Sequence, residues 1–161
     1  LAPMDVNNAD AMAHLFRSIF DRWGKVNFWA HTAVHAAPIG PAATMDERDW
    51  DKSIQLNVKT TGILISYVTP LLGEDGHAMF FEDTHIGEKF FGAYGASKAA
   101  QIALARSWAK ESEKTGPKVH IVTPPGMPTA TRARFFPGED RSSLSPVNDV
   151  AHTLLSDYLG N

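Results

Sequence analysis

The sequence contains no cysteine among its 161 residues. Neither a disulfide framework nor a thiolate metal site can therefore form, and a reducing compartment is compatible with the chain. Because length and composition are ordinary for a globular domain, we expect a cytoplasmic protein with a single domain.

Long apolar runs and basic clusters are also scarce. The longest apolar stretch, residues 62–72, is too short to span a bilayer and is interrupted by Ser66 and Pro70, so it indicates a core helix. The formal net charge is -3 and no basic run offers phosphate contacts, which argues against nucleic acid as a partner. His31 and His35 have the spacing of helical metal ligands, but they follow a strand and enter a proline-rich loop, so we expect no metal site.

The pattern that is present is an alternation of short apolar runs with longer stretches of helical period. Short runs flanked by turn residues predict buried strands of a parallel sheet, and polar side chains before the longer stretches predict capped helices. The expected strands are residues 4–6, 26–30, 78–81 and 119–122; the expected helices are 8–23, 44–57, 60–72, 93–111 and 145–158, with N-caps at Asn7 or Asn8, Thr44 and Ser145. This alternation predicts an α/β fold, a doubly wound parallel sheet, over residues 1–161.

Tyr94 and Lys98 are the candidate catalytic pair. Ligands of a doubly wound sheet bind outside the carboxyl ends of its strands, and these two residues follow such an end, four positions apart on one helix face. A nearby ammonium stabilises a phenolate and lowers the phenol pKa from about 10, which prepares the phenol for acid/base work. The alternative is a solvated helix face.

Together these residues resemble the short-chain dehydrogenase/reductase family, and the similarity runs through nearly the whole chain. Tyr94-x-x-x-Lys98 is similar to the family's catalytic pair, and Asn57 to its helix asparagine. The resemblance also implies a set of residues that contact the cofactor: Asp5 and Val6 at the adenine, Ala33 in the turn after the second expected strand, Pro124, and Thr129 at the nicotinamide carboxamide.

The resemblance implies a Rossmann-like fold and an oxidoreductase that interconverts a carbonyl and an alcohol with NAD or NADP, the choice between the two staying open. Tyr94 would be the general acid/base, Lys98 would lower its pKa and hold the ribose, and Asn57 would position a water. Thr84, counted back from Gly87, would supply the hydroxyl that bonds the substrate oxygen. A plain loop role for Thr84 stays the alternative.

The chain departs from the family pattern in several places. Val34 stands where the family has glycine and would be strained at positive φ, while Pro125 removes a backbone donor near the nicotinamide. There is no Gly-x-x-x-Gly-x-Gly loop, so we expect an incomplete stretch of a longer domain that lacks the N-terminal glycine-loop portion and the last strand. A redox-silent binding or scaffold subunit is therefore the alternative function.

Two further expectations concern the substrate and the assembly. Residues 132–138 lie where the family carries its substrate lid, and Phe135 and Phe136 there either close an apolar pocket or pack on the final helix. The family pairs its two long helices across subunits, here residues 50–72 and 93–111, which implies a homodimer or homotetramer. The expected partner is a small carbonyl or alcohol, without nucleic acid or membrane.

Overall fold

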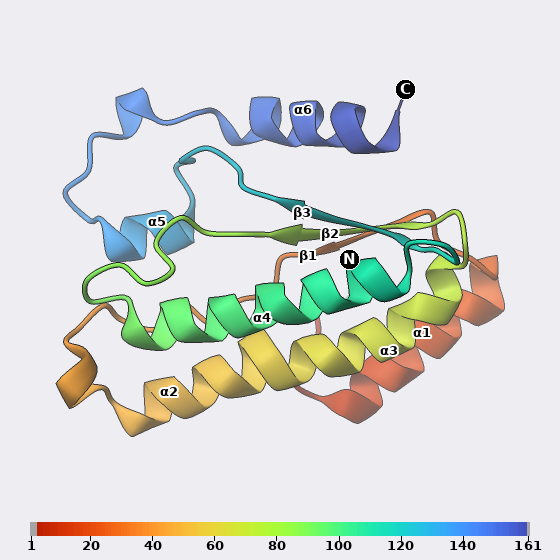
Figure 1. Cartoon of the computed structure of the whole chain (residues 1–161), viewed down its shortest axis with the longest axis horizontal. Coiled ribbons are helices and arrows are strands. Elements are labelled where there is room, and N and C mark those ends of the chain that lie inside the picture. Colours follow the sequence, from red (N-terminus) through yellow and green to blue (C-terminus); the bar gives the residue numbers. More distant parts are fainter. Residues whose placement is uncertain (1–2, 161) are drawn as a thin grey trace.

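The computed structural model describes residues 3–160. Its centre is a parallel sheet of β1 (Phe28–His31), β2 (His77–Phe81) and β3 (Lys118–Val122), hydrogen-bonded in the order β1-β2-β3 (Figure 1). The register pairs His31 with Phe80 and Phe81 with Val122, so all three strands end at the same edge. The doubly wound parallel sheet predicted from the sequence is confirmed.

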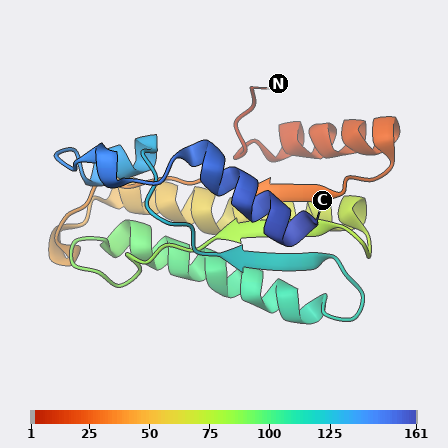
Figure 2. The ribbon, with the colours of Figure 1, turned by 90° about the horizontal axis from the view of Figure 1, so that it is seen from above.

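Helices cover both faces of this sheet. On one face lie α3 (Thr61–Leu72) and α4 (Gly92–Glu111), with α1 (Ala9–Trp23) packed beside α3, and α6 (Val147–Leu159) crosses the other face (Figures 1 and 2). The predicted cap of α1 is confirmed, because the Asn8 side chain accepts a hydrogen bond from the Ala11 nitrogen.

The strand expected at residues 4–6 is wrong. A strand needs a hydrogen-bonded neighbour, and the sheet within residues 3–160 consists of β1, β2 and β3 alone. The segment instead turns into α1, and the Asp5 carboxylate accepts a hydrogen bond from the Asn7 nitrogen at 2.9 Å.

The helix expected at residues 44–57 is built differently. It begins as α2 (Glu47–Ser53) after Asp46, whose carboxylate caps the Asp49 nitrogen, while Thr44 ends a short 3-10 turn, η1 (Ala42–Thr44). The capping box at Thr44 was wrong because Asp46 offers a better acceptor next to the first turn. A π-helical segment, η2 (Ile54–Thr60), then joins α2 to α3, and a π-turn of this kind is frequent at functional sites.

The C-terminal third differs from expectation in two details. The loop expected after β3 contains α5 (Ala130–Phe135), whose first turn is capped by the Thr129 hydroxyl, and a 3-10 turn, η3 (Arg141–Ser143). α6 begins at Val147 with Pro146 in the cap position, so the predicted Ser145 cap is wrong. Proline fixes φ for a helix start and has no N–H that needs a partner.

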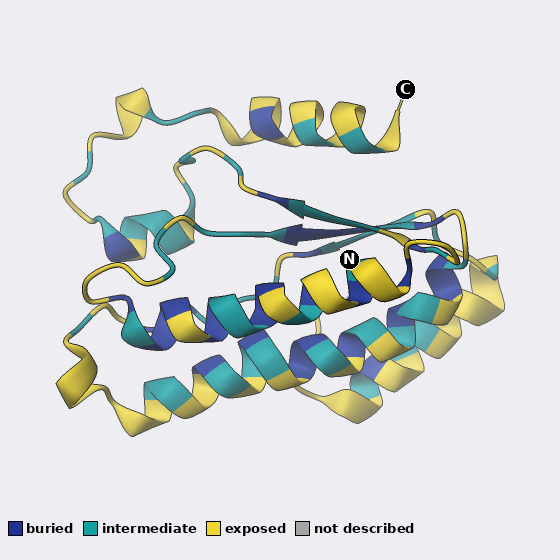
Figure 3. Ribbon diagram, in the orientation of Figure 1, coloured by how far each residue is buried: buried dark blue, intermediate teal, exposed yellow. Residues whose placement is uncertain are grey.

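The main core lies between the sheet and the α3–α4 layer (Figure 3). Its buried members are Val68, Leu72, Ala78, Phe80, Ile102, Ala105 and Trp108. Small residues such as Ala105, which is fully buried, let α4 approach the strands closely enough to place its first turns at the edge where the strands end. Within residues 3–160, no helix is long and apolar enough to cross a membrane.

Candidate active site

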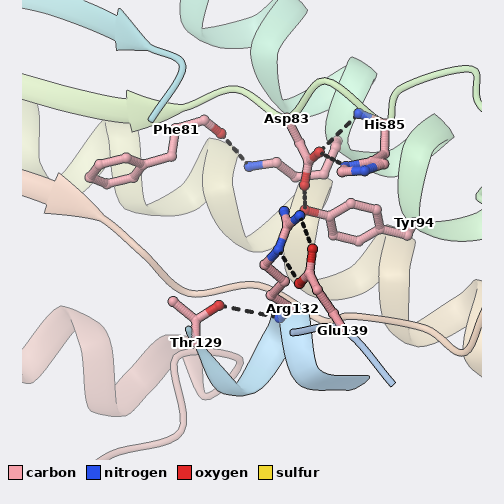
Figure 4. Close-up of polar contacts among 8 residues, drawn as sticks. Phe81, Asp83, His85, Tyr94, Thr129, Arg132 and Glu139 are labelled. Carbon is pink, nitrogen blue, oxygen red and sulfur yellow. Dashed lines mark hydrogen bonds and ion pairs between the residues drawn. The ribbon is translucent and has the colours of Figure 1, made fainter. Parts of the chain in front are cut away.

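The site lies where β2 ends over the first turns of α4. The loop after β2 packs directly on this helix, since a Cβ at Gly95 would lie 3.4 Å from the Gly87 nitrogen and 3.6 Å from the His85 carbonyl oxygen. A side chain longer than that of alanine at position 95 would push the loop away. The close approach places Asp83 beside Tyr94 (Figure 4).

Tyr94 is buried, and its hydroxyl donates a hydrogen bond of 2.6 Å to Asp83 Oδ2. Its ring packs against Phe135 at a centroid distance of 4.8 Å and against Phe91 at 6.3 Å. Burial and the Asp83 carboxylate both raise the Tyr94 pKa, because each disfavours the phenolate. The lowering expected from Lys98 is therefore wrong for this structure.

Lys98 forms its hydrogen bonds with groups other than the Tyr94 hydroxyl. Its ammonium is buried and donates to the Phe81 carbonyl oxygen and to Gln101 Oε1, each at 2.7 Å. Burial lowers the Lys98 pKa to about 8, although the charges of Asp83 and Glu82 oppose this shift. An ammonium has three donors, so two are used by the protein and one remains for another acceptor.

Asp83, which binds the Tyr94 hydroxyl, is itself held by His85. Asp83 Oδ1 accepts from the His85 backbone nitrogen at 2.9 Å and contacts His85 Nδ1 at 2.7 Å. Burial raises the Asp83 pKa, but the hydrogen bonds from Tyr94 and His85 outweigh it, and the net shift is downward. Sequence analysis placed neither residue in the candidate catalytic group. The available signal was a carboxylate two residues after the end of β2.

Thr84 is not the hydrogen-bond partner of the Tyr94 hydroxyl. It is exposed and lines a cavity of about 140 Å³ between the loop after β2 and α5, whereas Asp83 holds the Tyr94 hydroxyl. Its predicted contact with a substrate oxygen stays a prediction.

Asn57, in η2, is fully buried and forms hydrogen bonds with the loop after β1 and with α4. Its side chain accepts from the His35 nitrogen at 2.7 Å and donates to the His35 carbonyl oxygen at 3.0 Å and to Ser97 Oγ at 2.9 Å. The backbone carbonyl oxygen of Asn57 accepts a hydrogen bond from Gln101 Nε2 at 3.1 Å, so Gln101 connects Asn57 to Lys98. The amide side chain of Asn57 is thus engaged with the loop after β1.

A larger cavity, of about 510 Å³, lies between the sheet and α6. Tyr94, Lys98 and Asp83 face it together with Ala33 and Pro124. Most of its remaining wall is apolar: Phe28, Ala30, Val34, Met79, Phe81, Met127, Val147, Val150, Ala151, Leu154 and Leu155.

The other predicted cofactor residues lie elsewhere. Thr129 lines the smaller cavity and caps α5. Asp5 is exposed and Val6 is half-buried before α1, and neither is among the residues that line the two cavities at Tyr94. The structure therefore brings together Tyr94, Lys98, Ala33 and Pro124 at the larger cavity. Thr129 shares the smaller cavity with Pro124, whereas Asp5 and Val6 line neither.

The turn after β1 is not strained at Val34. Within residues 3–160, Phe90 is the non-glycine residue with positive φ, at 73°. Val34 instead packs against the buried cluster of Ala36, Phe91, Tyr94 and Phe135.

His31 is buried, and its Nε2 contacts Thr61 Oγ1 at 2.9 Å. Burial, followed by the charge of Lys98, lowers the His31 pKa to about 4. The described part of the chain holds no group of three side chains that could bind a metal ion.

The last residue of α5, Phe135, packs against the ring of Tyr94. Phe135 is buried against Tyr94 and Phe91 rather than against the final helix, and Phe136 lies beside His85 at a centroid distance of 5.2 Å. The Arg132 guanidinium forms two hydrogen bonds of 2.6 Å to Glu139, which fixes the segment after α5 (Figure 4).

Comparison with known proteins gives the family. The family model described as enoyl-(acyl carrier protein) reductase matches residues 1–152. The chain belongs to the short-chain dehydrogenase/reductase family. It is 30% identical over 124 residues to the uncharacterized oxidoreductase YciK of Escherichia coli K12, covering 74% of this chain and 49% of YciK.

Solved structures share the fold. A short chain dehydrogenase from Salmonella enterica serovar Typhi matches with a TM-score of 0.88 and 26% identity, over 95% of this chain and 65% of that one. A putative short chain dehydrogenase from Escherichia coli CFT073, solved with NADPH, matches with a TM-score of 0.85 and 25% identity, over 95% of this chain and 66% of that one. The present chain thus spans about half to two thirds of the length of these relatives.

Proposed function

We propose that the protein is an NAD(P)-dependent oxidoreductase that interconverts a carbonyl compound and an alcohol, with Tyr94 as the group that exchanges the proton. The observation that carries this proposal is that Tyr94 and Lys98 line one cavity of about 510 Å³ at the carboxyl ends of the strands. Ligands of doubly wound sheets bind at this edge. Membership of the family and the NADPH-bound relative support the choice of cofactor.

The residues present fit the nicotinamide half of such a cofactor. Ala33 and Pro124 leave space beside the strand ends, and the apolar wall suits a flat ring. Lys98 lines this cavity, and its third donor is suited to a ribose hydroxyl. When bound, the nicotinamide would supply or accept the hydride.

The protein's own residues then handle the proton and exclude water. Tyr94 gives its hydroxyl proton to the carbonyl oxygen in reduction and recovers one in the reverse direction. Phe135 and Phe136 shield the aromatic side of Tyr94 from water, which strengthens every hydrogen bond in the site.

Nucleotide binding is the direct test. NADPH or NADH is titrated into the protein while nucleotide fluorescence is recorded, and a saturable change is expected. Lys98→Met should weaken binding at least tenfold, because an ammonium contact contributes more than about 1.4 kcal/mol when partly desolvated. Lys110→Met is the matched control, since it removes an exposed lysine near the far end of the same helix. Absence of any fluorescence change with both nucleotides would refute the proposal.

A redox-silent binding subunit is the second candidate. Its specific support is that Lys98 binds Phe81 and Gln101 while Tyr94 binds Asp83, so the pair is not joined directly. Saturable nucleotide binding without turnover of any carbonyl or alcohol tested would favour it.

We also propose that the protein assembles as a homodimer or homotetramer through α3 and α4. The support is that α4 keeps Ala96 and Ala103 exposed on a face without bulky side chains, which allows close helix packing. A monomer mass in sedimentation equilibrium would contradict this.

A further inference from the structure

The geometry around Tyr94 points to a role for Asp83 that the family resemblance does not supply. Asp83 follows β2, is half-buried, and faces both cavities at the site. Its Oδ2 accepts a hydrogen bond of 2.6 Å from the Tyr94 hydroxyl, so the phenol is tied to a carboxylate.

The carboxylate is held in one orientation. Two donors of His85, the backbone nitrogen at 2.9 Å and Nδ1 at 2.7 Å, occupy Oδ1 and leave Oδ2 to Tyr94. His85 is itself fixed by stacking on Phe91 at a centroid distance of 4.9 Å and by contact with Phe136. The Asp83–His85 unit therefore presents one oxygen to the phenol as a preformed acceptor.

The chemistry of a carboxylate differs from that of a hydroxyl at this position. A hydroxyl both donates and accepts, but an ionised carboxylate only accepts and repels a second negative charge. It therefore stabilises the neutral phenol relative to the phenolate. Burial of Tyr94 acts in the same direction, and both effects raise the Tyr94 pKa.

Other charged groups surround the pair without reversing this effect. Lys98 lies on the same helix but donates to Phe81 and Gln101, and Arg132, which the α5 segment contributes, is neutralised by its two hydrogen bonds to Glu139. Glu82 precedes Asp83 and pairs with Arg106 at 2.7 Å. Asp83 is thus the charge in direct contact with the Tyr94 hydroxyl.

We propose that Asp83, oriented by His85, holds Tyr94 as a neutral phenol and so sets the direction of the reaction: the phenolate that alcohol oxidation requires is disfavoured, and carbonyl reduction is the step that the neutral phenol permits. This proposal rests on the proposed function. In the step, the Tyr94 hydroxyl exchanges its hydrogen bond to Asp83 Oδ2 for one to the carbonyl oxygen. The carbonyl carbon would gain a hydride from the reduced nicotinamide, the Tyr94 O–H bond would break, and its proton would form the alcohol O–H. The phenolate that remains regains a proton from water. Alcohol oxidation needs the phenolate at the start and becomes fast only at high pH.

The test measures Tyr94 ionisation without any need for turnover. Ultraviolet absorbance of tyrosinate is followed against pH, and the same titration of Tyr94→Phe is subtracted to remove Tyr67 and Tyr158. In Asp83→Asn, Tyr94 should lose its proton at least about one pH unit lower than in the wild type, which is a tenfold gain in phenolate. An unchanged titration would overturn the proposal.

Asp49→Asn is the matched control. Asp49 is a carboxylate 3.4 Å from a histidine nitrogen, His35 Nε2, and its side chain is 28% exposed against 24% for Asp83. Removing its charge should leave the Tyr94 titration unchanged. An equal shift in both variants would show a general charge effect and would also overturn the proposal.

Two further measurements keep the result decisive. Asp83→Ser supplies a neutral acceptor if Asp83→Asn fails to fold, and the same downward shift is expected. In the pH profile of alcohol oxidation, Asp83→Asn should reach half-maximal rate at lower pH than the wild type. Loss of nucleotide binding in the wild type would refute the proposed function alone, whereas binding and turnover with an unchanged Tyr94 titration would refute the role of Asp83 alone.

Discussion

The buried ammonium of Lys98 lowers the free energy of unfolding at neutral pH by a measurable amount. Its pKa falls from 10.5 to about 8 because burial disfavours the charged form, and the folded protein therefore binds this proton less tightly than the unfolded chain does. Between the two pKa values the unfolded state holds more protons. Stability must then rise with pH across this interval.

The size of the effect follows from the two pKa values. Each pKa unit corresponds to about 1.4 kcal/mol, so keeping the charged Lys98 buried costs about 3 kcal/mol at neutral pH. About 2 kcal/mol of this is recovered between pH 7 and pH 10, where Lys98 in the folded protein becomes neutral.

Urea unfolding at several pH values from 7 to 10 measures this directly. The free energy of unfolding of the wild type, minus that of Lys98→Met, should increase by about 2 kcal/mol over the range. Lys110→Met should follow the wild type. The raised Tyr94 pKa affects all three proteins alike and cancels in the difference. A difference that stays constant with pH would refute the reasoning, because Lys98 would then have the same proton affinity in both states.

Three further predictions follow from buried groups and strain. His31 has a pKa lowered to about 4, so it stays neutral in the folded protein, whereas in the unfolded chain it takes up a proton near pH 6.5. The free energy of unfolding should therefore fall by up to about 3 kcal/mol as the pH drops from 6.5 to 4. Urea unfolding of His31→Gln should show no such loss. Phe90→Gly should raise the unfolding free energy by about 1 kcal/mol, since Phe90 has φ of 73°, and a decrease would mean that the exposed ring contributes more than the strain removes. Asn57→Ala should lower the free energy of unfolding by about 2–4 kcal/mol, because two backbone groups of half-buried His35 and the buried Ser97 hydroxyl lose their hydrogen bonds to Asn57. A calorimetric change below about 1 kcal/mol would contradict this.

Much of the fold could be predicted because hydrophobic period reports burial on one face. The pattern located all three strands and the helices α1, α3 and α4, each within a few residues. It missed α5, since a six-residue helix beside prolines and glycines has too few turns to show a period. It also chose Thr44 over Asp46 as a cap, because two acceptors close together in sequence are distinguished only by the path of the chain.

The site was predictable only where spacing along one helix determines it. The four-residue interval correctly placed Tyr94 and Lys98 on one face, towards one cavity. The partners of these side chains come from the loop after β2 and from Gln101, and such contacts depend on tertiary packing. The sign of the Tyr94 pKa shift was wrong for the same reason, since spacing contains no information on burial or on the carboxylate of Asp83.

Comparison of Tyr94→Phe with the wild type tests the central claim most directly. NADPH binding is measured by nucleotide fluorescence, and turnover by the loss of NADPH absorbance with a panel of carbonyl compounds. If Tyr94 is the proton donor, the wild type reduces at least one compound, while Tyr94→Phe retains nucleotide affinity within about twofold and loses at least about 100-fold in rate, the usual size of a general acid contribution. Equal loss of binding and turnover, or undiminished turnover in Tyr94→Phe, would contradict the account.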